Sequence, residues 1–389
     1  MKFFLRILSW LYAFGVWIRN SLYDSGLQHV LKSPLPTICV GNLAVGGTGK
    51  TPHVEYIGQL LEANGYQFAI LSRGYKRKSV GFVLASDKST VNTIGDESLQ
   101  LKMKHPNWIV AVCKERIIGL YELRRHFPKL DCVILDDAFQ YRRINPGYSM
   151  ILTQADRLYV EDQLLPLGRL REPVIGCLRA QMVVVTKCPE HMQPIDQRLV
   201  DSKLKLLPSK TLVFSRMEYQ PLAPVFPDSS PNVGVKLQST PPLADKGGCA
   251  SKPTNRQACI EDLSQVPAGQ RGIKPGQRVL LLTGIAQPHY LYDHLRQEAA
   301  ELTHLTFPDH HAFTERDMQQ LEELFSQKHC TLIVTTEKDA VRLRHTKYFP
   351  TNLKPLIYAM PIEVKFLNDG QHIFDNNILN YVRQSTKDR

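Results

Sequence analysis

The sequence predicts an α/β protein of two layered units, and three observations support this prediction. Short runs of β-branched and aliphatic residues alternate with segments whose apolar residues have helical spacing. The runs are continuously apolar, which is typical of strands buried on both faces of a parallel sheet. Strands that alternate with helices indicate α/β layers. A length of 389 residues allows two such units, each with its own core.

The expected strands form two sets along the chain. The first set comprises 37–40, 68–71, 133–135, 150–152 and 183–185, and the second comprises 211–214, 279–282, 331–334 and 356–358. The stretch from about 227 to 277 is rich in Pro, Ser, Gly, Asn and Lys, with little periodicity beyond a short helix near 260–263. So long a loop is unusual in a compact domain, so we interpret it as an insertion.

We therefore expect three parts in this chain. Residues 1–22 form an N-terminal helix, 23–209 form the first α/β domain, and 210–389 form the second domain, which carries the insertion at about 227–277.

The charge of the chain favours an anionic partner. The net charge is +11 at pH 7 and the calculated pI is about 9.2. A nucleotide, a nucleic acid or an anionic membrane surface would each suit this surplus. No known nucleic-acid-binding module surrounds the basic clusters at 72–78 and 165–173, so we expect no nucleic acid as a partner.

Residues 3–18 form an apolar run that is interrupted by Arg6 and Ser9. The run is shorter than the roughly 20 apolar residues that span a bilayer. It also lacks the small-residue cleavage site of a signal peptide. Trp10, Tyr12 and Trp17 stand among basic residues, as in helices that lie at the headgroup level of a membrane. We favour an interfacial helix; a helix buried against the first domain is the alternative.

A phosphate-binding loop gives the strongest local pattern. A predicted strand at 37–40 runs into glycines, then Lys-Thr, then a segment of helical character. The loop consists of Ala44, Val45, Gly46, Gly47, Thr48, Gly49, Lys50 and Thr51. Glycines let backbone amides converge on phosphate oxygens, Lys50 would reach the β- and γ-phosphates, and the Thr51 hydroxyl would bind Mg²⁺. Ala44 replaces the first glycine of the usual pattern, but the rest is intact. We conclude that the protein binds a nucleoside triphosphate.

Two other classes of nucleotide-binding protein fit less well. Partitioning ATPases carry a lysine where Val45 stands, directly before the glycine pair. GTPases carry an [NT]KxD motif that reads the base; 186–189 begins like it but lacks the aspartate, and 336–339 has the wrong spacing.

Several side chains could serve phosphoryl transfer to an alcohol, which needs Mg²⁺, a base and positive charge. Asp136 and Asp137 follow a buried strand, as in a Walker B segment, although a helix cap and a solvated acid would look alike. Asp96 precedes a helical segment and could be only its N-cap. His310, between Asp309 and His311, could belong to a metal patch or form a general-base unit with a carboxylate.

Taken together, these stretches resemble the tetraacyldisaccharide 4′-kinase (lipid A 4′-kinase) family. The matching stretches, in the family's order, are VGNLAVGGTGKTP at 40–52, SRGYKR at 72–77, GDES at 95–98, LDDAFQYRR at 135–143, LLPLGRLREP at 164–173, LTGIAQP at 282–288, FPDHHAFT at 307–314 and TTEKDAVRL at 335–343. The resemblance implies transfer of the γ-phosphate of ATP, with Mg²⁺, to the 4′-hydroxyl of tetraacyldisaccharide 1-phosphate. It also implies two α/β/α domains, the first with a P-loop NTPase-like parallel sheet, and an active site between them.

The resemblance also implies roles for individual residues. Asp96 would be the catalytic base, assisted by His310 from the second domain. Asp136, Asp137 and Glu172, with Thr51, are the candidate Mg²⁺ and ATP ligands, and the set among the three acids stays open. Arg116 and Arg171 would partner phosphate charge, beside Lys50. Ala138 stands where the family usually has glycine, which a negative φ would tolerate.

The resemblance further implies a location and a substrate. The family works at the cytoplasmic face of the inner membrane of Gram-negative bacteria, on a glycolipid with four acyl chains. Each CH₂ that leaves the bilayer for water costs about 0.8 kcal/mol, so we expect peripheral or monotopic binding at the membrane surface. We expect a monomer. A partitioning ATPase without a lipid acceptor is the alternative function.

Overall fold

The computed structural model describes residues 2–227 and 272–387, and these form two compact units. The first unit contains Met1–Tyr219 and Ile362–Arg389, and the second contains Gln220–Pro361. The predicted insertion at 227–277 lies outside the described residues except at its two ends. Each unit is an α/β layer with a mainly parallel sheet, so the predicted fold class is confirmed.

The first unit is built on a nine-stranded sheet with the order β16-β10-β9-β8-β2-β6-β3-β5-β4. Its strands are β2 (Thr37–Gly41), β3 (Phe68–Ser72), β4 (Val83–Leu84), β5 (Ile109–Val112), β6 (Cys132–Asp136), β8 (Tyr148–Gln154), β9 (Met182–Thr186), β10 (Thr211–Tyr219) and β16 (Ile362–Phe366). Only the outermost pairs, β4 with β5 and β16 with β10, are antiparallel. The parallel strands therefore end at one common edge.

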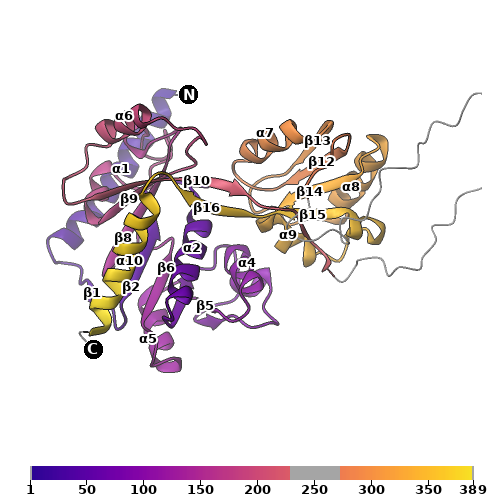
Figure 1. The fold of residues 1–389 in the computed structure, drawn as a ribbon. Helices are drawn as coiled ribbons and strands as arrows, with labels where there is room; N and C mark the ends of the chain where they lie inside the picture. The colour runs from indigo at the N-terminus through magenta and orange to yellow at the C-terminus, as the bar shows by residue number, and fades with distance from the viewer. Residues whose placement is uncertain (1, 228–271, 388–389) are drawn as a thin grey trace, which may run out of the picture. The chain divides into compact units, whose positions relative to one another are not determined.

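The helices of this unit lie on both sides of that sheet (Figure 1). They are α2 (Lys50–Ala63), α3 (Val91–Ile94), α4 (Asp96–Lys104), α5 (Arg116–His126), α6 (Pro194–Leu204) and α10 (Gly370–Lys387). Short 3₁₀ turns at Tyr159–Glu161 and Val174–Arg179 and a small pair of strands, β1 (Leu31–Lys32) with β7 (Ile144–Asn145), complete the unit. The central strands are buried along their length, as their continuously apolar sequences predict.

The predicted domain boundary at 209/210 is wrong, and so is the assignment of the whole C-terminal part to the second domain. Strand β10 pairs in parallel with β9, so it extends the first sheet. Strand β16 then pairs antiparallel with β10, from Ser215 opposite Phe366 to Tyr219 opposite Ile362. Helix α10 packs on β10, β16 and α2. Sheet membership depends on pairing across about 150 residues, which a strand's own composition does not encode.

The second unit has a five-stranded sheet with the order β11-β15-β14-β12-β13. Its strands are β11 (Ala223–Pro224), β12 (Arg278–Thr283), β13 (Glu301–Thr306), β14 (Leu332–Thr336) and β15 (Ile357–Met360). All neighbours are parallel except β11 and β15. Its helices are α7 (His289–Glu298), α8 (Glu315–Gln327), α9 (Glu337–Arg344) and the 3₁₀ turn Thr351–Leu356. The expected strands at 279–282, 331–334 and 356–358 coincide with β12, β14 and β15.

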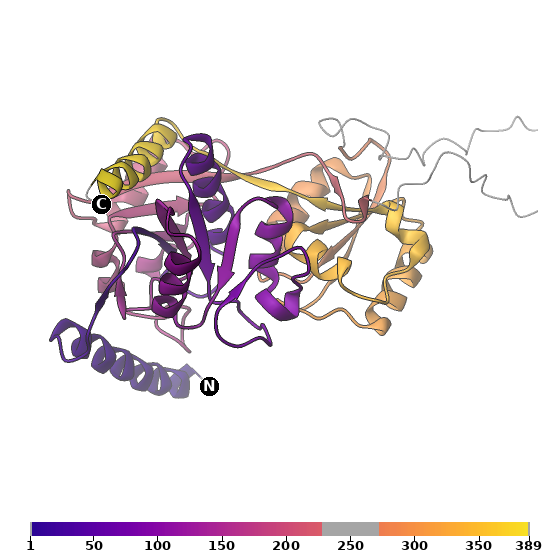
Figure 2. The ribbon, with the colours of Figure 1, turned by 90° about the horizontal axis from the view of Figure 1, so that it is seen from below.

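The N-terminal helix α1 (Lys2–Asp24) lies along one side of the first unit (Figure 2). It is longer than the 22 residues predicted for it. Its large apolar side chains face away from the protein: Phe3, Phe4, Ile7, Leu8, Trp10, Leu11, Phe14, Trp17 and Ile18 are all exposed. Within the described part of the chain, no helix has the length and apolar character that crossing a bilayer requires.

The packing of α10 predicts a stability effect on the first unit. Phe374 is 0% exposed, whereas its neighbour Ile373 is 40% exposed. We expect Phe374→Ala to lower the free energy of unfolding by about 3–5 kcal/mol, because it leaves a cavity between α10 and the sheet. Ile373→Ala should cost about 0.5 kcal/mol or less. Urea unfolding followed by tryptophan fluorescence measures this in the first unit, because Trp10, Trp17 and Trp108 all lie there. Equal losses for the two variants would contradict the packing of α10.

Candidate active site

The predicted phosphate loop connects β2 to α2, in the strand-loop-helix setting that its sequence indicates. Gly46 and Gly49 have φ values of +114° and +85°, which side-chain-bearing residues rarely adopt. A Cβ at Gly49 would also lie 2.5 Å from Met217 Cε. Helix α2 begins at Lys50, and the amides of Lys50 and Thr51 lack intrahelical acceptors, so they can meet an anion. Pro52 has no N–H, and His53 N donates to Gly49 O at 3.3 Å.

Three side chains hold the carbonyl oxygens of this loop. Gln154 Nε2 donates to Gly47 O at 3.0 Å, and Thr186 Oγ1 donates to Thr48 O at 2.9 Å. His53 Nδ1 lies 2.8 Å from Gly49 O, so it carries the proton. Burial lowers the pKa of His53 to about 4, so the ring is neutral. Since its carbonyls are occupied, the loop can turn amides toward a phosphate. Sequence reasoning missed all three residues; the strand-end positions of Gln154 and Thr186 were the available signal.

The first part of the loop pairs with a second segment. Ala44 forms a β-bridge with Leu170, and Val45 N donates to Arg169 O at 2.8 Å. The Val45 amide is therefore occupied by protein, as is the Thr48 amide, which donates to Gly46 O at 2.9 Å. Ala44 and Val45, which were predicted as part of the phosphate loop, thus pair with residues 169–170.

A charged network lies at the ends of β2 and β6. Lys50 Nζ lies 3.4 Å from Asn42 Oδ1 and 3.8 Å from Asp137 Oδ1. Arg171 binds the Asp137 carboxylate through both terminal nitrogens, at 2.8 and 3.2 Å, and also donates to Asn42 Oδ1. Asn42 Nδ2 in turn donates to Thr48 Oγ1 at 3.0 Å. The predicted Lys50, Asp137 and Arg171 are thus brought together, with Asn42 as a link that sequence reasoning missed.

The two adjacent aspartates differ in their electrostatic surroundings. Asp136 is 2% exposed, and its Oδ1 is buried without a hydrogen-bond partner. Burial, followed by the nearby Glu97 and Asp137 carboxylates, raises the pKa of Asp136 to about 7. Burial also tends to raise the pKa of Asp137, but Lys50 and Arg171 outweigh it and hold that pKa far below its usual value. Asp137 has a φ of +47°, a left-handed conformation that costs a non-glycine residue energy.

Arg116 and Glu172 lie beneath this network rather than in the open. Arg116 is 4% exposed, donates to the Lys114 and Asp137 carbonyl oxygens, and stacks 5.5 Å from the Tyr141 ring centroid. Glu172 is fully buried, and both of its oxygens are bonded: Arg179 donates to one at 2.8 Å and Gln140 to the other at 3.1 Å. Arg116 therefore contacts the backbone of Asp137, and Glu172 holds Gln140 and Arg179 in place.

Asp96 is the first residue of α4 and is 4% exposed. The helix cap is Gly95, so the interpretation of Asp96 as an N-cap is wrong. Gly95 has a φ of +82°, and a Cβ there would lie 3.0 Å from Tyr75 O, so the start of α4 packs closely on the segment after β3. Since the neighbouring Glu97 acts on the pKa of Asp136, the start of α4 lies near the carboxyl end of β6.

His310 belongs to the second unit, between β13 and α8. Its φ is +59°, and its Nε2 lies 3.2 Å from Lys338 Nζ and 3.7 Å from Asp309 Oδ2. Lys338 Nζ is also 3.5 Å from Asp309 Oδ1, so three residues from two of the matching stretches meet. Lys338 lies in the 336–339 stretch that sequence reasoning gave no role. Among the described residues, no group of three His, Cys, Asp or Glu side chains is placed so that it could hold a metal ion, at 309–311 or elsewhere.

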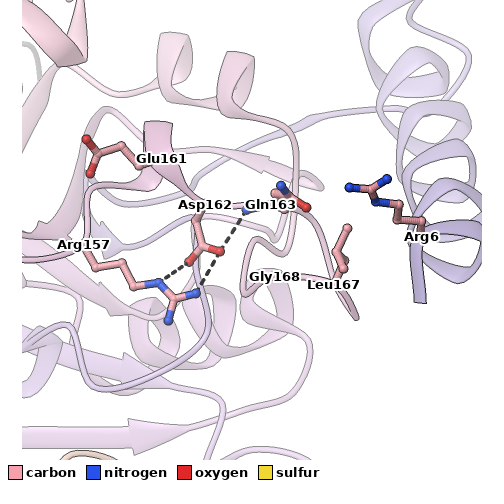
Figure 3. A pocket seen from close by; sticks show the side chains of 7 residues that line it. All are labelled: Arg6, Arg157, Glu161, Asp162, Gln163, Leu167 and Gly168. Atoms are coloured by element: carbon pink, nitrogen blue, oxygen red, sulfur yellow. Dashed lines mark hydrogen bonds and ion pairs between the residues drawn. The ribbon is translucent and has the colours of Figure 1, made fainter. Parts of the chain in front are cut away.

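The first unit also contains a cavity of about 330 Å³ that no residue of the phosphate loop lines. It lies between α1 and the segment after β8, and it is lined by Arg6, Arg157, Glu161, Asp162, Gln163, Leu167 and Gly168 (Figure 3). Its acids are already paired, Asp162 with Arg157 and Arg169, and Glu161 with Lys203.

Comparisons with known proteins agree with the motifs found above. The sequence model of a family described as Tetraacyldisaccharide-1-P 4'-kinase (LpxK) matches residues 1–383. A tetraacyldisaccharide 4′-kinase of Bacteroides thetaiotaomicron is 42% identical over 384 residues, covering 98% of this chain and 93% of that protein. The enzyme of the same name from Porphyromonas gingivalis is 36% identical over 391 residues and covers 97% of both chains.

A solved structure agrees with the fold. LpxK from Aquifex aeolicus, crystallised in complex with ATP, superposes with a TM-score of 0.65 at 24% identity and covers 98% of this chain and 99% of its own. The family match over nearly the whole sequence and the relatives at 42% and 36% identity establish that the chain belongs to the tetraacyldisaccharide-1-phosphate 4′-kinase family.

Proposed function

We propose that this protein transfers the γ-phosphate of ATP to the 4′-hydroxyl of tetraacyldisaccharide 1-phosphate, which gives the 4′-phosphorylated lipid IVA in lipid A assembly. The family match and the relatives named tetraacyldisaccharide 4′-kinase support this activity. One observation of the structure carries it: the glycine-rich loop ends at Lys50, which lies beside a pair of carboxylates with opposite electrostatic surroundings. A loop of this kind binds a triphosphate. Of the two carboxylates, one can bind a metal ion while the other pairs with the lysine.

Residues of the loop bind and orient ATP in this proposal. The amides of 46, 47 and 49–51, the last two at the N-terminus of α2, receive the β- and γ-phosphates, and Lys50 adds positive charge. Arg171 faces the same network through Asp137 and Asn42. Its remaining capacity suits the transferring phosphate, because a guanidinium binds phosphate through parallel hydrogen bonds. Arg116 contributes as a buried charge behind Asp137.

The residues at the end of β6 fit a Mg²⁺ ion. The buried Asp136 Oδ1 has no hydrogen-bond partner, and burial together with the nearby Glu97 and Asp137 carboxylates raises the pKa of Asp136 to about 7, so this position favours added positive charge. A divalent ion supplies that charge, and oxygen ligands are what Mg²⁺ prefers. We assign Asp136 and the Thr51 hydroxyl as its protein ligands. Mg²⁺ would neutralise phosphate charge as it is transferred. Asp137 then serves Lys50 and Arg171, and Glu172, bonded at both oxygens, holds Gln140 and Arg179.

Asp96 acts as the base in this proposal. One of its oxygens accepts from Glu97 N at 3.0 Å, which orients the carboxylate at the start of α4. The carboxylate would take the proton of the 4′-hydroxyl as that oxygen attacks the γ-phosphate. His310 would assist from the second unit. Lys338 Nζ lies 3.2 Å from His310 Nε2, which fixes the orientation of the ring.

The surface of α1 supports a membrane location. Nine of its large apolar side chains are exposed, and an outward apolar face of this size suits insertion among lipid headgroups. We propose that the protein acts as a monomer on the cytoplasmic face of the inner membrane, held there by α1 and by its positive charge. There the glycolipid keeps its acyl chains in the bilayer.

The base assignment predicts a large loss of turnover. At saturating ATP, we expect Asp96→Asn and His310→Gln each to lower kcat for transfer to tetraacyldisaccharide 1-phosphate in detergent, by about 10²–10⁴-fold for the base itself. Labelled ATP and separation of the glycolipid product measure this. Asp87→Asn, in the exposed loop before α3, and His311→Gln, whose Nε2 already binds Asp317, are the matched controls. Turnover of Asp96→Asn near that of the wild type would exclude the assigned role.

The two aspartates predict opposite effects on stability. Because the pKa of Asp136 is higher in the folded than in the unfolded protein, the folded state holds an extra proton between about pH 4 and 7. Stability from this group is therefore lost as the pH rises from about 4 to about 7, by about 1.4 kcal/mol per pH unit at most, and the loss levels off above pH 7. Without ATP and Mg²⁺, Asp136→Asn should gain in unfolding free energy relative to wild type between pH 5 and 8. Asp137→Asn should instead lower the unfolding free energy, because Lys50 and Arg171 stabilise the charged form of Asp137 and so lower its pKa.

The same unfolding experiment tests the metal assignment. Millimolar Mg²⁺ at pH 8 should stabilise the wild type and leave Asp136→Asn unaffected, since ligand binding to the native state raises its stability. Equal stabilisation of both proteins would contradict Asp136 as a ligand.

The exposed face of α1 predicts vesicle binding. We expect Leu11→Glu with Phe14→Glu to reduce binding to vesicles that contain phosphatidylglycerol by at least about tenfold, because two charges would enter the apolar region. Val80→Glu with Ile175→Glu, which adds the same charge at exposed apolar positions elsewhere, should leave binding nearly unchanged. Sedimentation with vesicles measures both. If the two double variants lose binding equally, overall charge and not α1 holds the protein at the surface.

A further inference from the structure

Helix α1 is attached to the protein through two hydroxyl groups. Ser9 Oγ donates to Leu164 O at 2.9 Å, and Tyr12 Oη donates to Arg171 O at 2.8 Å. Ser9 is 6% exposed and Tyr12 is half-buried, although most of their neighbours on α1 face outward. Both acceptors belong to one segment, 164–171, which also forms one wall of the cavity beside Arg6 in Figure 3.

The other side of this segment contacts the phosphate loop. Arg169 O accepts from Val45 N at 2.8 Å, Arg171 N donates to Leu43 O at 2.7 Å, and Leu170 bridges Ala44. Arg171 also places its guanidinium on Asp137 and Asn42. The two ends of this segment are hydrogen-bonded to each other, because Leu165 N donates to Leu170 O at 3.0 Å. It therefore lies between α1 and the first half of the phosphate loop, in contact with both.

The polarity of α1 shows that this attachment is specific. A helix that only anchors the protein needs its apolar face toward lipid and no particular partner behind it. Here the inward side of α1 carries, beside the buried Val16, two hydroxyls that donate to the Leu164 and Arg171 carbonyl oxygens. The Arg171 carbonyl and its guanidinium belong to the same residue, so a shift of the backbone at 171 moves the group that binds Asp137.

We propose that Ser9 and Tyr12 are positioning residues through which α1 holds 164–171 against the phosphate loop and so sets the affinity for ATP. The proposal rests on the function proposed for the loop and for α1. Neither hydroxyl touches substrate. They act through Arg171 and through the Arg169–Val45 hydrogen bond. A helix that is seated on the membrane would thus also support the nucleotide site.

The test measures ATP affinity and vesicle binding on the same proteins. In the full-length protein in detergent, we expect Tyr12→Phe and Ser9→Ala each to weaken the Kd for ATP, measured by calorimetry, by about 3–10-fold, the effect of losing one hydrogen bond. Vesicle binding should change by less than about twofold. Tyr23→Phe and Ser21→Ala remove the same hydroxyl groups elsewhere on α1 and should leave both measurements unchanged.

A double-mutant cycle separates positioning from general loosening of the fold. If Tyr12 acts through Arg171, Tyr12→Phe should weaken ATP binding much less in an Arg171→Ala background than in the wild type. An unchanged Kd in Tyr12→Phe, or effects that add fully with Arg171→Ala, would overturn the proposal. Tyr12→Phe keeps the ring, so it remains informative if Ser9→Ala does not fold. Failure of the wild type to bind ATP would instead refute the function proposed for the loop.

Discussion

The adjacent carboxylates of Asp136 and Asp137, at the end of β6, have opposite electrostatic surroundings. The candidate site of the first unit depends on this difference. Asp137 is paired with Arg171 and Lys50, whereas the buried Asp136 has an oxygen without a partner. Burying an unpaired carboxylate costs several kcal/mol unless it is protonated or meets a cation. Burial and the neighbouring acids raise the pKa of Asp136 to about 7, and a bound metal would replace the proton that this carboxylate can hold. An unpaired buried carboxylate therefore lowers the stability of the free protein, and a bound cation would restore it.

Hydrogen bonds from three side chains hold the phosphate loop in place beside this buried carboxylate. The loop's carbonyls are held by Gln154, Thr186 and His53, which come from the ends of two strands and the first turn of α2. His53 Nε2 also lies 3.0 Å from Ser215 Oγ on β10. The loop is thereby joined to the sheet at points far apart in the sequence. Amides fixed in this way can meet a triphosphate without reorganising, which is the main source of electrostatic stabilisation in such sites.

Helix α1 reverses the usual arrangement of a helix on a globular protein. Its apolar side chains face outward, and hydroxyls of Ser9 and Tyr12 face the protein. Sequence analysis could identify the apolar run and its aromatic residues, but not which face would meet the protein. That choice depends on carbonyl groups at 164 and 171, more than 150 residues away.

The sequence by itself determined the α/β class, the phosphate loop, and the strands of both sheets except β4, β5, β11, β13 and β16. These features depend on local periodicity and on a contiguous motif. Asp136, Asp137 and Arg171 were found from motifs in the same way. Tertiary structure decided which residues share a sheet, so β10 and the C-terminal β16 joined the first unit. It also decided that Asn42, Gln154, Thr186 and His53 support the loop, and that Glu172 is bonded at both oxygens. Such contacts join distant parts of the chain, and neither spacing nor composition encodes them.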